Sequence, residues 1–185
     1  MLLNHEREKL LNAIIFFANR TSFLGKIKLC KLLYFLDFEH FKETGRPVTG
    51  LNYFAWPKGP VPVELFNEVN EPKPDLAEKI RFSETKIRDG YKLNVEPLVA
   101  FDPTHFSKRE LAILERLASE FDKTKAEDMI EATHLENLPW HKIYNELGLK
   151  QQLIPYDLAL RRQEKAEMLG IVAERKALIR HFRKT

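Results

Sequence analysis

The sequence has 185 residues, 44% of them apolar and 31% charged, and its formal net charge is +3. This length fits one domain, or a domain with a helical appendage, and the apolar content can fill a substantial core. Its single cysteine excludes a disulfide framework and a cysteine-based zinc site, which favours a reducing compartment. Charges near the N-terminus leave no apolar run for a signal peptide, and no apolar stretch reaches the length of a membrane span. We therefore expect a soluble, cytoplasmic protein.

The N-terminal part shows two helical patterns followed by a short β-like region. The spacing of apolar residues predicts helices over 6–19 and 25–41, and Gly45 is a suitable stop for the second helix. The aromatic run 51–56 predicts a strand or extended segment. Residues 57–62 then turn the chain into a short helix, in which a proline near the first turn is tolerated.

The middle of the chain predicts a β-hairpin. Two runs with partial alternation, 78–86 and 91–95, flank the sequence Arg88-Asp89-Gly90. Asp-Gly between two such runs is typical of a hairpin turn. We therefore expect the β portion of this protein to be small.

Helical signals return in the second half of the chain. Residues 107–110 and 124–127 each spell a capping box, in which a hydroxyl and a carboxylate bind the free amides of a helix start. These boxes predict two helices, of which the second ends near His134. Residues 138–147 predict another helix, and Tyr156 opens a long C-terminal helix.

These patterns predict an α+β protein that is predominantly helical. We expect a compact helical domain with a small β-hairpin or sheet and a long C-terminal helix. The main domain is assigned to residues 1–150, and residues 151–185 form a basic helical extension that packs on the same domain. No repeat or low-complexity segment is present.

The second predicted helix carries polar residues on its apolar side. Asp37 and His40 are three residues apart and fall within the apolar sector, so they need hydrogen-bond partners in the interior. With His134 they would supply a carboxylate and two imidazoles, a set that suits zinc or iron. We favour a second interpretation, in which these groups form a hydrogen-bonded network that braces Tyr53 and Trp56, and we expect no metal and no cofactor.

The opposite side of the same helix carries apolar residues among charges. Leu32 and Phe35 lie between Lys28, Lys31 and Lys42. If this side faces water, the two apolar side chains form a contact patch with a basic rim. We therefore predict that these five residues bind a partner. Trp140 is a further aromatic anchor of the kind found in cores and at interface rims.

Positive charge collects at the C-terminus. This distribution is compatible with nucleic-acid binding or with a solvated helix that has a basic last turn. The same segment carries an apolar stripe, which would pack on the main domain, form a dimer contact or capture a partner. The basic residues are Arg161, Arg162, Lys165, Arg175, Lys176, Arg180, Arg183 and Lys184, and the stripe comprises Met168, Ile171, Val172, Ile179 and Phe182.

No enzymatic motif is apparent in the sequence. It lacks a glycine-rich phosphate loop followed by Lys-Ser or Lys-Thr, a Gly-x-Ser-x-Gly elbow and a His-Glu-x-x-His helix. We therefore predict that the protein is not an enzyme.

Several short motifs together resemble one known family. They are Lys28 to Phe35, then Asp37 and His40, then Gly45-Arg46-Pro47-Val48-Thr49-Gly50, then Tyr53 and Gly59-Pro60-Val61-Pro62, and finally Thr133-His134 with Pro139-Trp140. In this order the motifs resemble the Panacea domain of SocA-type antitoxins, which are found in bacteria and their phages.

The resemblance runs from about residue 14 to residue 144. It implies an antitoxin that binds a cognate toxin and neutralises it, either by blocking it or by delivering it to a Clp-type protease. A nucleic-acid-binding regulator is the alternative function, and a metal-dependent enzyme is the third.

Overall fold

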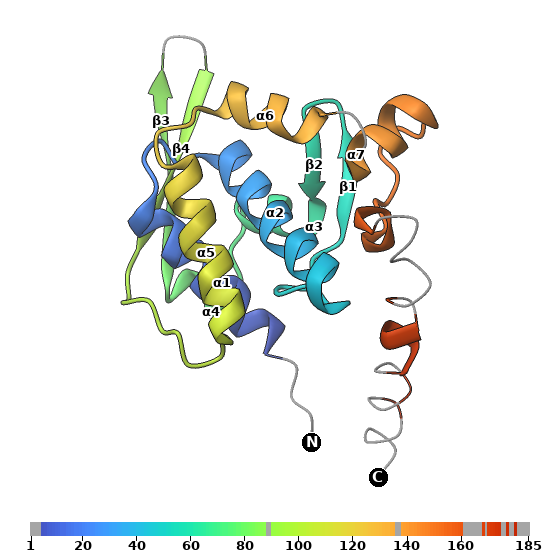
Figure 1. Cartoon of the computed structure of the whole chain (residues 1–185). Coiled ribbons are helices and arrows are strands. Elements are labelled where there is room, and N and C mark those ends of the chain that lie inside the picture. Colours follow the sequence, from blue (N-terminus) through green and yellow to red (C-terminus); the bar gives the residue numbers. More distant parts are fainter. Residues whose placement is uncertain are drawn as a thin grey trace.

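The computed structural model describes residues 5–87, 90–135 and 138–160, together with 168, 170–174, 177 and 180. Two small antiparallel sheets, each of two strands, lie on opposite sides of the central helices (Figure 1). The protein is therefore α+β and predominantly helical, as the sequence predicts. The elements are α1 (Glu6–Arg20), α2 (Lys26–Thr44), β1 (Tyr53–Trp56), β2 (Gly59–Pro62), α3 (Val63–Glu68), α4 (Pro74–Ala77), β3 (Ile80–Ile87), β4 (Gly90–Pro97), α5 (Lys108–Phe121), α6 (Ala126–His134), α7 (Pro139–His141), the π-helix η1 (Lys142–Glu146) and the 3-10 turn η2 (Tyr156–Ala159).

Helix α2 is the central element of the fold. It packs against α1, α5, α6, β2 and η2 (Figure 1). Most of its residues are buried, including four polar ones, so it has no continuous solvated face. It ends at Gly45, which takes the left-handed conformation with φ of 71° and donates its amide to the carbonyl of Phe41. The predicted stop at Gly45 is thus confirmed.

The two hairpins differ in their surroundings. Strands β1 and β2 pair from Tyr53 with Pro62 to Trp56 with Gly59, and β2 packs on α2. Strands β3 and β4 pair from Ile80 with Pro97 to Ile87 with Gly90, which confirms the predicted hairpin. Its turn residues 88 and 89 lie outside the described residues.

Two predicted local features differ from the structure. Residues 59–62 form strand β2 instead of continuing the turn. Pro60 and Pro62 are tolerated there because they lie opposite Ala55 and Tyr53, whose backbone groups bind residues 151–154, so no amide is needed from either proline. Helix α6 begins after Lys125, and Thr124 makes no capping bond there, so the second capping box is wrong. The first box is confirmed, since the Ser107 and Glu110 side chains bind each other's backbone amides.

The long C-terminal helix is also not supported. Residues 156–159 form one 3-10 turn, and Leu160 is extended with ψ of 140°, so no long helix starts at Tyr156. Most of the basic residues between 161 and 184, with Ile179 and Phe182, lie outside the described residues.

The segment after residue 150 lies against the main domain. Leu153 forms a bridge with Phe54 beside β1, and Leu160 is buried. Further on, Met168 and Val172 lie against the α-carbon of Gly45, where an added Cβ would come within 2.9 and 3.1 Å of their side chains. The division of the chain after residue 150 stays a prediction.

Lys28 joins three segments at the N-terminal end of α2. Its Nζ donates to the carbonyls of Ser22, Asp122 and Thr124 at 2.7, 2.8 and 2.9 Å. Two of these carbonyls follow the last turn of α5, where a cation is favoured by the helix dipole. Burial lowers the pKa of Lys28, against the charge of Asp122. Lys28 therefore has a structural role, and its predicted position on an exposed patch is wrong.

Replacing this cation should destabilise the fold. In Lys28→Met the apolar stem is kept but three partly buried carbonyls lose their donor, so we expect the free energy of unfolding to fall by about 3 kcal/mol. Urea unfolding measures this change. The matched control is Lys123→Met at an exposed position just after α5, where we expect a change within about 0.5 kcal/mol. Equal effects of the two variants would contradict this role.

Candidate functional site

A buried carboxylate connects α2 to the loop that leads into β1. Asp37 is fully buried, and its Oδ1 accepts from the amides of Val48 and Thr49 at 2.8 and 2.7 Å. Its Oδ2 accepts from the hydroxyls of Thr49 and Tyr53. A third hydroxyl, that of Tyr156, lies 3.4 Å from the same oxygen and donates to the carbonyl of Leu51. These bonds hold the aromatic segment against α2.

The environment of Asp37 favours its neutral form. Burial raises the pKa of Asp37 to about 6, although Thr49, Tyr53 and Val48 all donate to the carboxylate and oppose this shift. The rings of Phe38 and Phe41 close the site on the Tyr156 side, with centroids 4.5 and 5.3 Å from the Tyr156 ring. The site therefore holds a carboxyl group inside an aromatic shell.

His40 has different partners from Asp37. Its Nδ1 lies 2.8 Å from the carbonyl of Arg46, and its Nε2 lies 3.9 Å from the carboxylate of Glu110. Burial lowers the pKa of His40. Burial of Glu110 works against its charge, but Lys9 and the amide of Ser107 hold its pKa below the usual range. Lys9 and Glu110 thus form a partly buried ion pair, with Lys9 Nζ 2.7 Å from the buried carboxylate.

A second polar cluster lies under the β1–β2 turn. Lys31 is buried, and its Nζ donates to the carbonyl of Pro60 at 2.9 Å. Burial lowers the pKa of Lys31 to about 8. Gly59, with φ of 96°, brings its α-carbon so close that an added Cβ would lie 2.6 Å from Lys31 Nζ and 2.7 Å from Thr133 Oγ1. A glycine is therefore required at this point on two grounds, conformation and space.

His134 and Trp140 complete this cluster. Their rings stack with centroids 3.7 Å apart, and the indole nitrogen of Trp140 donates to the carbonyl of Trp56 at 2.9 Å. Burial lowers the pKa of His134, and the charge of Lys31 adds to this effect. The Nε2 atom of His134 is buried and has no hydrogen-bond partner within the described chain. Trp56 and His134 are half-buried, whereas Trp140 is buried.

The structure separates the residues that would form the hypothetical metal site. Asp37 binds the loop 48–53, His40 faces Glu110, and His134 stacks on Trp140. Among the described residues, no group of three or more His, Cys, Asp or Glu side chains is placed to hold a metal ion. The chemistry of Asp37, with hydroxyl and amide donors aimed at it, suits internal bracing.

The predicted basic patch on α2 is only partly on the surface. Leu32, Lys28 and Lys31 are buried, so their placement on an exposed patch is wrong. The cause is that α5, α6 and β2 cover the side of α2 that the sequence pattern assigns to water. Phe35 is half-buried and stacks on Phe121, whereas Lys42 is exposed.

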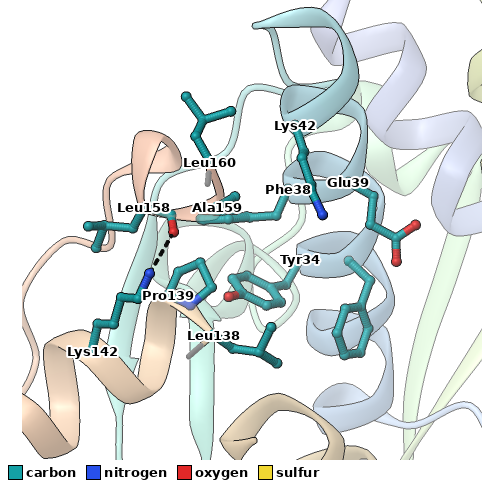
Figure 2. A pocket seen from close by; sticks show the side chains of 11 residues that line it. Tyr34, Phe38, Glu39, Lys42, Leu138, Pro139, Lys142, Leu158, Ala159 and Leu160 are labelled. Atoms are coloured by element: carbon teal, nitrogen blue, oxygen red, sulfur yellow. Dashed lines mark hydrogen bonds between the residues drawn. The ribbon is translucent and has the colours of Figure 1, made fainter. Parts of the chain in front are cut away.

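These last two residues line a groove beside α2. It has a volume of about 410 Å³ and is walled by α2 on one side and by the segments around 138–142 and 158–160 on the other (Figure 2). Lys142 crosses one end and donates to the carbonyl of Leu158 at 3.3 Å. The lining residues are Tyr34, Phe35, Phe38, Glu39, Lys42, Leu138, Pro139, Lys142, Leu158, Ala159 and Leu160.

Four residues of these sites were missed by the sequence reasoning. Thr49 lies within the 45–50 motif, which could have marked it as a partner of Asp37. Glu110 was recognised as part of a capping box but not as a buried ion-pair partner. Tyr156 and Lys142 carry no local signal, because both act through contacts distant in sequence.

The fold and the site together define a small, mostly helical α+β protein whose central helix is held by buried polar groups. A family model described as the antitoxin SocA-like Panacea domain matches residues 29–141. This match covers more than half of the 185 residues, so the chain belongs to the SocA-like Panacea family. No curated protein and no solved structure matches the chain. No described helix has the length and apolar character that a membrane span requires.

The Asp37 carboxyl should make stability depend on pH. Its pKa in the fold is about 6 against an ordinary 3.8, so between these values the folded chain holds a proton that the unfolded chain has lost. Stability from this group is therefore lost as the pH rises from about 4 to about 6, by about 3 kcal/mol in total.

The Asp37→Asn variant replaces the titrating carboxyl group with a neutral amide of the same shape. We expect the stability advantage of the natural chain over the variant to be largest near pH 4 and to shrink by about 3 kcal/mol by pH 7. Urea unfolding of both proteins at each pH measures the difference, and titrations shared by the two proteins cancel. An advantage that grows with pH would show that the carboxylate is favoured in the fold.

Gly59 should be far less tolerant of substitution than Gly148, which also has a positive φ but has no atom close to an added Cβ. We expect Gly59→Ala to lower the free energy of unfolding by about 2–4 kcal/mol, because the methyl group displaces Lys31 and Thr133 in addition to the backbone strain. The control is Gly148→Ala, where φ is 65° and no atom lies within 4 Å of an added Cβ. Strain alone there costs about 1 kcal/mol. Thermal or urea unfolding that gives equal losses would contradict the steric argument.

Proposed function

We propose that this protein neutralises a cognate toxin by binding it directly. The observation that carries this proposal is the family match over residues 29–141, which supports an antitoxin-like role. The described structure is compatible with a binding protein, because its buried polar groups hold α2, the loops and the hairpin β1–β2 together. A rigid frame of this kind loses little conformational entropy when it binds a partner.

The proposed contact surface is the face of α2 that stays accessible. Phe35 and Lys42 are the residues of the predicted patch that are not buried, and together they still combine apolar area with positive charge. They belong to the groove in Figure 2, which adds apolar walls from Leu138, Pro139 and Leu158. Aromatic anchors in a pocket with a polar rim are typical of protein interfaces.

Delivery of the toxin to a Clp-type protease is a finer proposal that follows from the family resemblance. Blocking and delivery differ in what happens to the toxin after binding. Delivery shortens the lifetime of the toxin only in cells that contain the protease, whereas blocking leaves its amount unchanged. Antibody detection of the toxin in cells with and without the protease separates the two mechanisms.

Co-expression with the neighbouring reading frame of the native locus tests the proposed function. We expect the neighbour to arrest growth when expressed alone, and growth to recover when this chain is present and co-purifies with it. A harmless neighbour that does not bind would contradict the proposal. Binding to DNA or RNA with an affinity that falls steeply with salt would instead favour the nucleic-acid-binding alternative.

A further inference from the structure

The groove beside α2 has the dimensions and the lining of a site for a few side chains. Its volume of about 410 Å³ lies within the range of pockets that bind small ligands or short peptide segments. One wall is aromatic, formed by Tyr34, Phe35 and Phe38 of α2. The opposite wall, with Leu138, Pro139 and Leu158, is aliphatic (Figure 2). An apolar anchor is therefore the group that fits the interior of the groove.

A buried hydroxyl in this wall has no acceptor. Tyr34 is almost completely buried, and although the backbone amide of Trp140 lies at its hydroxyl oxygen, the hydroxyl finds no acceptor within the described chain. In Figure 2 this hydroxyl points toward Pro139, across the floor of the groove. A buried donor without an acceptor is costly, so an acceptor that enters beside Pro139 would gain from binding the Tyr34 hydroxyl. An occupant with both apolar and polar atoms therefore binds this wall better than a purely apolar one does.

The charges at the rim favour an acidic occupant. Lys42 is exposed, and no acidic group of the described chain pairs with it. Lys142 uses one donor for the Leu158 carbonyl and keeps two others. Glu39, the acidic residue of the lining, is paired with Arg116 of α5. The rim therefore presents the ammonium groups of Lys42 and Lys142, while the Glu39 carboxylate is already paired with an arginine.

The neighbouring sheet edge excludes one mode of peptide binding. A peptide cannot add as a strand to the outer edge of β1, because residues 151–154 already occupy it. The amide of Ala55 donates to the Gln152 carbonyl at 2.9 Å, and the amide of Ile154 donates to the Tyr53 carbonyl at 2.8 Å. An occupant of the groove must therefore be held by its side chains.

We propose that this groove docks a segment of the partner protein that carries an apolar anchor flanked by Asp or Glu. The anchor lies between Tyr34 and Leu158, and the acidic residues bind Lys42 and Lys142. This proposal rests on the proposed function, in that the partner it describes is the neutralised toxin. The two can nevertheless be tested separately.

The direct test selects peptides from a displayed random library on the full-length protein. We expect the enriched peptides to combine an aromatic or large aliphatic residue with adjacent Asp or Glu. Affinities of one synthetic peptide are then measured for the natural chain and for three variants. Ala159→Trp fills the groove, Lys42→Glu reverses a rim charge, and Tyr34→Phe removes the buried hydroxyl.

The three variants have distinct expected effects. Filling the groove and reversing the charge should each weaken peptide binding at least about tenfold. Tyr34→Phe should weaken binding about fivefold while changing the melting temperature little, since in the free protein the hydroxyl donates to no acceptor of the described chain and loses only its contact with the Trp140 amide. The control Lys108→Glu, at an exposed first-turn position of α5 outside the groove, should bind as the natural chain does.

Several results would overturn the proposal. They are the absence of any enriched peptide, enrichment of peptides without acidic residues, and unchanged binding in both Ala159→Trp and Lys42→Glu. If Ala159→Trp does not fold, Lys42→Glu at its exposed position still decides the outcome. If both variants fold and neutralise the toxic neighbour as well as the natural chain does, the groove proposal fails while the proposed function stands. If the neighbour is harmless but acidic peptides are still selected, the proposed function fails while the proposed binding of acidic segments by the groove stands.

Discussion

The structure depends on the burial of one carboxylate at the centre of the molecule. Asp37 projects from α2 into the interior, where two amides and two hydroxyls from the loop 48–53 converge on it. A carboxylate loses its hydration in such a place, and it is kept only if donors replace the water. The loop that supplies these donors leads directly into β1, so satisfying Asp37 also fixes where the first hairpin begins. Tyr156 reaches the same site from a distant part of the chain and adds a third element to it.

Helix α2 repeats this arrangement along its length. Lys28 binds carbonyls at the ends of two neighbouring segments, Lys31 binds the β2 carbonyl of Pro60, and His40 lies between the Arg46 carbonyl and Glu110. Each polar residue thus contacts a different part of the fold. A helix with an entirely apolar surface would pack against the same neighbours in several rotations of similar energy. Fixed polar partners select one rotation, since every other one leaves a charge unpaired in the interior.

The sequence predicts the elements better than it predicts which side of them is covered. The periodicity of the helices, the capping box at Ser107, the stop at Gly45 and the β3–β4 hairpin are local signals, and the structure confirms them. Lys28 and Lys31 look solvated in sequence because lysine is rarely buried. Their acceptors are backbone carbonyls, which every sequence contains and no pattern reveals. The hydrogen bonds of Lys28 span as many as 96 positions along the chain. Periodicity within one helix cannot report a partner at that separation, and the groove, which brings α2 beside residues 138–160, is hidden for the same reason.

The burial of these lysines also decides what is left for binding a partner. Because Lys28, Lys31 and Leu32 are buried, the accessible part of α2 is a narrow strip that includes Phe35 and Lys42. The strip faces a wall whose residues, from Leu138 to Leu160, come from the C-terminal part of the domain. The wall is attached to the rest of the fold by the bridge at Leu153 and by Tyr156. The same buried network around Asp37 that specifies the fold therefore also sets the position of the C-terminal wall of the groove relative to α2. A change in that network would alter the width of the groove without touching its lining, which links the stability of the core to the recognition of a partner.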